Sequence, residues 1–67
     1  MDLPQVGDLY GDHDTLSRYR VRVIEVNKQL CDIGRKGVRL ENLSTGRKHW
    51  TSMQRLYLGY RLVRGAR

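Results

Sequence analysis

Hydrophobic and polar positions alternate most regularly from Arg18 to Val26, where the chain reads Arg-Tyr-Arg-Val-Arg-Val-Ile-Glu-Val. A period of two, filled with β-branched and aromatic residues, is typical of a half-buried strand. We therefore expect a strand over residues 18–27, with one face against a core and the other in water. The alternation slips by one residue at Val23-Ile24, which predicts a bulge or a strong bend.

Four shorter segments have the same character. Together with residues 18–27, they predict five strands, over residues 5–10, 18–27, 38–43, 47–51 and 59–63. A polar loop over residues 11–17 follows the first of them, and Gly46 lies in a short connection that predicts a hairpin. Residues 64–67 are expected to form a mobile tail.

One segment, residues 52–56, has the features of a helical turn. Ser52 can cap it, and Met53 and Leu56 are spaced so that both face the same side. Five residues do not sustain a longer helix.

Residues 28–37 are expected to be mainly loop, because they include Gly34 and Gly37. Leu30 and Ile33 are the side chains expected to hold this loop against the core.

The order of these elements predicts an all-β fold, a small five-stranded antiparallel barrel of the SH3 type with one short helical turn near residues 52–56. Closure of a barrel removes the free edges of a short sheet. The chain is expected to form a single domain over residues 1–67, ordered from about residue 5 to about residue 63.

Several short motifs resemble a group of small proteins from actinobacteria and their bacteriophages. The segments that carry the resemblance are Val6-Gly7-Asp8, Arg20-Val21-Arg22-Val23, Thr45-Gly46-Arg47-Lys48-His49-Trp50, Arg55-Leu56 and Gly59-Tyr60-Arg61-Leu62-Val63. The resemblance covers roughly residues 6–63. It implies a small barrel like those of SH3, Tudor and KOW modules and a phage origin, and it implies no catalytic residues.

The composition limits the core and the compartment. The chain has no Phe, one Trp and four Tyr, so the core must come from aliphatic residues, Trp50 and some of the tyrosines. Cys31 is the only cysteine, which excludes an internal disulfide, and its neighbours favour a small buried side chain. No apolar run approaches the roughly 20 residues that span a bilayer, so we expect a cytoplasmic protein without membrane contact.

The net charge of +6 is unevenly distributed. Residues 1–17 carry four acidic side chains and no Lys or Arg, whereas residues 18–67 carry all thirteen basic side chains against three acidic ones. Ten of the thirteen are arginines, which suit bidentate contact with phosphate or carboxylate. The distribution predicts an anionic partner.

The basic side chains most suited to such a partner lie on predicted strands and beside the hairpin turn. They are Arg18, Arg20, Arg22, Arg39, Arg47 and Lys48. Side chains 18, 20 and 22 should share one strand face at intervals of about 7 Å. If the set converges, it forms a surface for the phosphates of DNA or RNA.

The alternative is an adaptor that binds protein, for example a phage or bacterial accessory protein that presents its arginines to an acidic host protein. Asp12 and Asp14 near Tyr10 resemble in part the acidic loop of SH3 domains, although the paired tryptophans of that family are missing. Self-association into a homodimer would also help so small a core.

Catalysis is not expected. His13 and His49 are the only histidines, and neither has an obvious nucleophile as partner. His13 lies between Asp12 and Asp14, but adjacent residues rarely converge on one ion, so we expect no metal and no cofactor.

Overall fold

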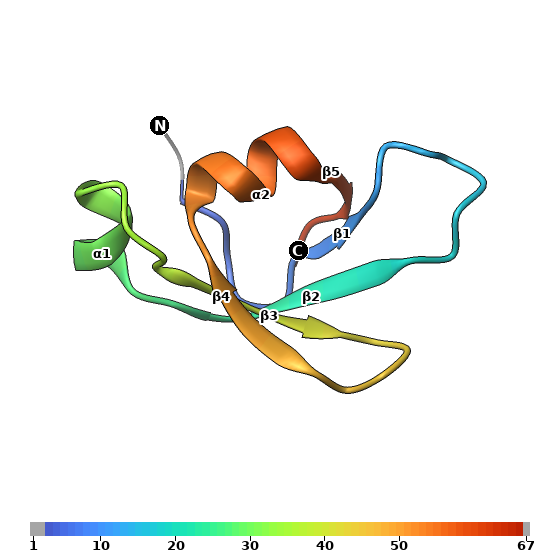
Figure 1. The fold of residues 1–67 in the computed structure, drawn as a ribbon, viewed down its shortest axis with the longest axis horizontal. Helices are drawn as coiled ribbons and strands as arrows, with labels where there is room; N and C mark the ends of the chain where they lie inside the picture. Colours follow the sequence, from blue (N-terminus) through green and yellow to red (C-terminus); the bar gives the residue numbers. More distant parts are fainter. Residues whose placement is uncertain (1–2, 67) are drawn as a thin grey trace.

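The computed structural model describes residues 3–66 and contains one sheet of five antiparallel strands with two short helices (Figure 1). The strands are β1 (Leu9–Gly11), β2 (Arg20–Val26), β3 (Val38–Asn42), β4 (Lys48–Thr51) and β5 (Arg61–Arg64). The helices are α1 (Lys28–Asp32) and α2 (Met53–Gly59). The strand order is β4-β3-β2-β1-β5, so β4 and β5 are the two edges and the sheet is not closed.

The five-stranded, mostly β architecture is confirmed, while the ends of the elements shift by a few residues. The central strand begins at Arg20 rather than at Arg18, because the Ser17 side chain turns the chain just before it. The Ser17 hydroxyl accepts a hydrogen bond from the Tyr19 backbone N–H at 3.1 Å. Arg18 therefore lies in the loop that leads into β2.

The bulge expected at Val23-Ile24 is confirmed. Val23 pairs with Leu40 and Glu25 pairs with Arg39, so Ile24 is the extra residue on β2. Because of this extra residue, Val26 faces the same side of the sheet as Val23, and it pairs with Val38 on β3.

The expectation of a loop over residues 28–37 is wrong in its first half, where α1 forms. The Asn27 side chain accepts a hydrogen bond from the Leu30 backbone N–H at 3.2 Å and so caps the helix. The helix turns Cys31, rather than Ile33, toward the core: Cys31 is buried and Ile33 is 68% exposed.

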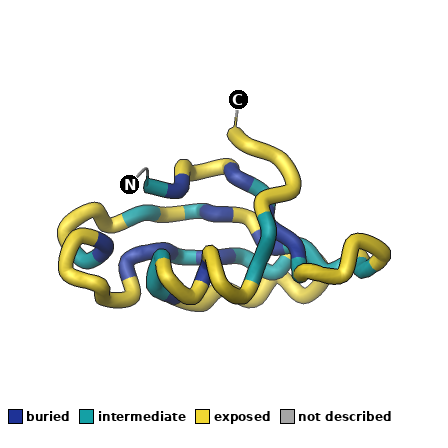
Figure 2. The backbone as a smooth tube through the Cα atoms, turned by 90° about the horizontal axis from the view of Figure 1, so that it is seen from above, coloured by how far each residue is buried: buried dark blue, intermediate teal, exposed yellow. Residues whose placement is uncertain are grey.

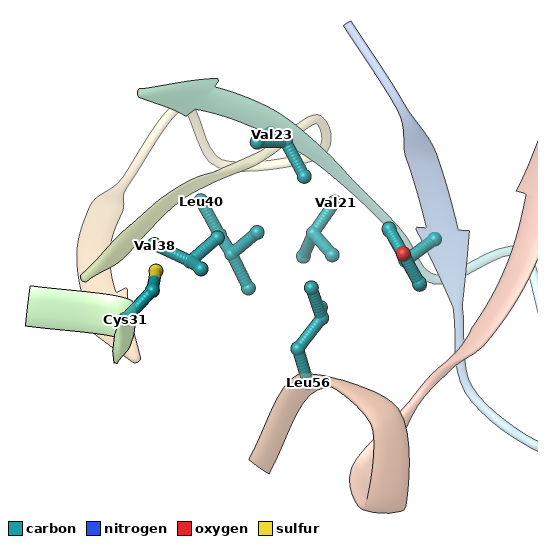
Figure 3. Close-up of a cluster of buried hydrophobic side chains, with 7 residues drawn as sticks. Val21, Val23, Cys31, Val38, Leu40 and Leu56 are labelled. Atoms are coloured by element: carbon teal, nitrogen blue, oxygen red, sulfur yellow. The ribbon is translucent and has the colours of Figure 1, made fainter. Parts of the chain in front are cut away.

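The helical turn expected at residues 52–56 is confirmed, with Ser52 as its cap, and it extends to Gly59. The Ser52 hydroxyl accepts a hydrogen bond from the Arg55 N–H at 3.2 Å. The helix is sustained by packing rather than by length, because Leu56 is fully buried and points toward Val21 on the sheet (Figure 3).

The core lies between α2 and the face of the sheet that it covers, and burial is concentrated on the strands (Figure 2). Its buried hydrophobic members are Tyr10, Val21, Val23, Cys31, Val38, Leu40 and Leu56. Tyr19 packs against this core, as its place in the alternation predicts. Cys31 is a small buried side chain, also as expected.

The buried carboxylate of Asp8 joins the two ends of the described chain. It accepts hydrogen bonds from the backbone N–H groups of Gln5, at 2.9 Å, and of Ala66, at 2.8 Å. The last strand extends to Arg64, so the segment expected to be a tail is paired and bonded as far as Ala66. The final position of that expected tail, residue 67, lies outside the described residues.

Candidate functional site

The face of the sheet opposite the core carries two cross-strand rows of charged and aromatic side chains. In the first row, Leu9 on β1 lies opposite Arg22, Arg22 opposite Glu41, and Glu41 opposite Lys48 on the edge strand. Arg22 and Lys48 are exposed, and Glu41 is half-buried between them. The row therefore alternates in sign and carries one net positive charge.

The second row holds an aromatic side chain. Arg39 on β3 lies between Glu25 on β2 and Trp50 on β4. A guanidinium nitrogen of Arg39 is 3.7 Å from a carboxylate oxygen of Glu25, and its Cζ lies 5.9 Å from the centre of the Trp50 ring. This geometry is that of a cation–π contact, which holds the indole against a positive charge.

Trp50 is 37% exposed, which contradicts the expectation that it belongs to the core. The reason is the phase of β4: Thr51 pairs with the buried Val38 and is itself buried, so its neighbour Trp50 faces the other way. An exposed Trp is unusual in a chain with so few aromatic residues, and it provides a flat apolar surface beside the cations.

Arg20 stabilises the fold rather than contributing to the candidate binding surface. Its guanidinium donates hydrogen bonds to the backbone carbonyls of Ser17, at 2.9 Å, and Tyr19, at 2.7 Å. It also lies against Gly11, where a Cβ would come within 2.8 Å of an Arg20 nitrogen. Arg20 therefore fixes the end of the loop before β2 and has little freedom to bind a partner.

The six predicted residues thus divide into three groups. Arg22, Arg39 and Lys48 share the outer side of β2, β3 and β4 with Trp50, and we call these four residues the Trp50 face. Arg47 is exposed in the turn that precedes β4, next to Lys48. Arg20 is bound to backbone carbonyls, and Arg18 is exposed in the preceding loop, outside the strand.

The sequence did not indicate that Trp50 belongs to this face, or that Glu25 and Glu41 lie opposite its cations. The signal for Trp50 was present in the hairpin, since a turn around Gly46 aligns Arg39 with Trp50 on one face. Arg39 and Glu25 form the only ion pair among residues 3–66, so the other cations of the face keep their charge available.

Among residues 3–66, no group of three or more His, Cys, Asp or Glu side chains is placed to hold a metal ion. His13 lies in the exposed loop with its Nε2 2.9 Å from the Leu58 carbonyl oxygen. Burial, and then the nearby Asp32 carboxylate, raise the pKa of the Cys31 thiol, which disfavours the nucleophilic thiolate.

None of the helices in the described part of the chain is long and apolar enough to cross a membrane. Comparison of the chain with models of protein families, with characterised proteins and with solved structures finds no match.

Proposed function

We propose that the protein binds single-stranded nucleic acid through the Trp50 face. The observation that carries the proposal is the exposed Trp50 ring, held against Arg39 and set on the same side of the sheet as Arg22 and Lys48. Proteins that bind single strands without strong sequence preference combine aromatic side chains, on which bases stack, with cations that contact the backbone. The Trp50 face offers both.

A single strand suits this surface better than a duplex. Every base has a π-face that can stack on an indole, but the bases of a duplex are already stacked on one another. Among residues 3–66, the face is formed by strands and has no projecting helix that could enter a major groove.

Glu25 and Glu41 lie among the cations and moderate their attraction for phosphate. With three cations in contact with the strand, the logarithm of the affinity should fall with the logarithm of the salt concentration with a slope of about 2. We therefore expect modest affinity that is strongly salt-dependent.

The strand order and the helix between β4 and β5 support a related proposal about the fold. We propose that the sheet is a small barrel of the SH3 type with a gap between its two edge strands. In that arrangement the Trp50 face is the outer wall of the barrel.

The test uses the intrinsic fluorescence of Trp50, because it is the only Trp in the chain. Titration with an oligonucleotide of about ten nucleotides should quench this fluorescence, since a stacked base contacts the indole directly. The quenching should weaken as salt rises.

Arg22→Ala and Lys48→Ala should each weaken binding about fivefold and each reduce the salt slope by about 0.7. Lys28→Ala is the matched control, because it removes the same charge from α1, away from β4 (Figure 1). Quenching that is absent at low salt, or that responds equally to all three substitutions, would refute the proposal. In that event, capture of an acidic protein that requires Arg22 and Lys48 would favour the accessory-protein alternative.

A further inference from the structure

A second feature lies on the other side of β4, where a cavity of about 740 Å³ opens between this strand, α2 and two loops. Four residues with aromatic side chains and two basic residues are prominent in its lining: Tyr19, His49, Trp50, Tyr60, Lys36 and Arg55. Its volume is in the range of about 300–1,000 Å³ that is typical of small-molecule sites. Trp50 borders both this cavity, which we call the Tyr60 cavity, and the Trp50 face.

One wall of the Tyr60 cavity is a pair of stacked rings. Tyr19 and Tyr60 have ring centroids 6.1 Å apart and planes inclined by 16°, and both pack against the core. Burial, followed by the hydrogen bond with Tyr19, raises the pKa of Tyr60 to about 12. A phenol of ordinary pKa is already neutral at physiological pH, and the raised pKa keeps Tyr60 neutral further into the alkaline range. The Tyr60 side of this wall is therefore an uncharged aromatic surface.

The cations come from two different elements. Lys36 belongs to the connection between α1 and β3, and Arg55 is exposed on α2. Neither forms an ion pair with another described residue. Two such cations beside aromatic rings match the two parts of a nucleotide, a charged phosphate and a planar base.

We infer that the Tyr60 cavity holds one unstacked base of the bound single strand, with its phosphate at Lys36 and Arg55. This inference rests on the proposed function, because the strand would cross the β4 edge at Trp50 to reach the cavity. Stacking on the Trp50 face tolerates any base, whereas a base that contacts polar groups of the cavity can be distinguished by its hydrogen-bonding edge.

Asp12 is the residue through which the cavity could select one base over another. Asp12 is among the residues that line the cavity, and its Oδ1 accepts a hydrogen bond from the Asp14 N–H at 3.0 Å. A carboxylate accepts from the amino group of cytosine but repels the carbonyl oxygen that thymine or uracil presents at the same position. The cavity should therefore prefer bases with an amino group, such as cytosine, over thymine or uracil.

Paired oligonucleotides of about ten nucleotides, oligo(dC) and oligo(dT), test this selection with bases of the same size. We expect tighter binding of oligo(dC) by at least about threefold, in line with the net value of one hydrogen bond. Asp12→Asn should reverse the preference, because its oxygen still accepts from the Asp14 N–H while its NH2 group donates to the thymine carbonyl and opposes the cytosine amino group. Arg55→Ala should weaken binding of both.

Amide NMR shifts provide a second measurement that does not depend on a substitution. Cytidine monophosphate should shift the amide signals of Lys36, His49 and Arg55, whereas the amide of Lys28 on α1 should not move. Together, these measurements distinguish failure of the cavity inference from failure of the proposed function. If oligonucleotides quench Trp50 but these amides stay unmoved and oligo(dC) binds no better than oligo(dT), the cavity inference is wrong and the proposed function stands. If the oligonucleotides do not bind, both are wrong.

Discussion

The Arg39 guanidinium is shared between an aromatic ring and a carboxylate: its Cζ lies 5.9 Å from the Trp50 ring centre, and one of its nitrogens lies 3.7 Å from Glu25. Both side chains of the ion pair are partly exposed, at 39% for Arg39 and 55% for Glu25. A pair of this kind contributes about 0–1 kcal/mol to stability. In the proposed binding mode, Glu25 would compete with phosphate for Arg39.

This relationship predicts that Glu25→Gln strengthens oligonucleotide binding about threefold at low salt, because it removes a negative charge from the surface. The free energy of unfolding should change by less than about 1 kcal/mol. Trp50 quenching and urea denaturation give the two quantities. Asp32→Asn, which removes a negative charge from α1, is the control. An equal gain in affinity from the control would mean that the net charge of the protein, and not the position of Glu25, determines the affinity.

The packing of α2 on the sheet predicts a large difference between two leucines of the same helix. Leu56 is fully buried, and Leu58 is 71% exposed. Leu56→Ala should lower the free energy of unfolding by about 2–5 kcal/mol, which is enough to unfold much of so small a domain. Leu58→Ala should change it by about 0.5 kcal/mol or less. Thermal denaturation followed by circular dichroism measures both, and similar melting temperatures would contradict this placement of α2.

A second pair of substitutions tests how α1 approaches β3. A Cβ at Gly37 would lie 2.7 Å from both the Asn27 carbonyl oxygen and the Cys31 Sγ, and 2.8 Å from the Cys31 nitrogen. Two of these atoms are backbone and cannot move without shifting the helix, so Gly37→Ala should cost about 1–3 kcal/mol.

Gly59 provides the matched control, since nothing lies within 4 Å of a Cβ there. Gly59→Ala should be neutral or should stabilise the fold by about 0.4–1 kcal/mol, because Ala restricts the unfolded chain. Urea denaturation of the two variants measures this contrast. An unchanged midpoint for Gly37→Ala would show that α1 does not sit as described.

The sequence predicted the strands well where side chains alternate, as in β2 and β3, because that period reports directly which face is buried. It also predicted the bulge at Ile24 and the cap at Ser52, which are local features with local signals. It failed at α1, where a single capping residue, Asn27, decides between helix and loop. Such short elements depend on tertiary packing that the pattern does not contain.

The candidate site was predicted less well than the fold, for a related reason. Whether Arg18 belongs with Arg22 depends on where β2 begins, and that depends on one hydrogen bond from the Tyr19 N–H to Ser17. Trp50 was expected in the core because large aromatic residues are usually buried, yet the phase of its strand places it outside. The Tyr60 cavity joins residues from four separate segments, so no local pattern could have indicated it.

Two tyrosines with raised pKa values, Tyr10 and Tyr60, make the stability of the fold sensitive to alkaline pH. Burial is the main cause that raises the pKa of Tyr10 from 10.0 to about 12, with smaller contributions from Tyr57 and Asp8. The pKa of Tyr60 is raised to about 12 as well. Between pH 10 and pH 12 the folded protein therefore retains protons that the unfolded chain releases, so the stability that these phenols contribute is complete below pH 10 and is lost as pH rises through 12.

Tyr10→Phe should make the fall in stability above pH 10 less steep, and the double variant with Tyr60→Phe should flatten it further. The urea midpoint measured at a series of pH values on both sides of 10 gives the slopes directly. Below about pH 9 the three curves should run parallel, because both phenols are almost fully protonated there in the folded and the unfolded state. The other titrating side chains, such as the lysines, affect all three proteins alike and cancel in the comparison. Equal slopes above pH 10 would mean that Tyr10 and Tyr60 are not shielded from water as the packing of α2 against the sheet requires.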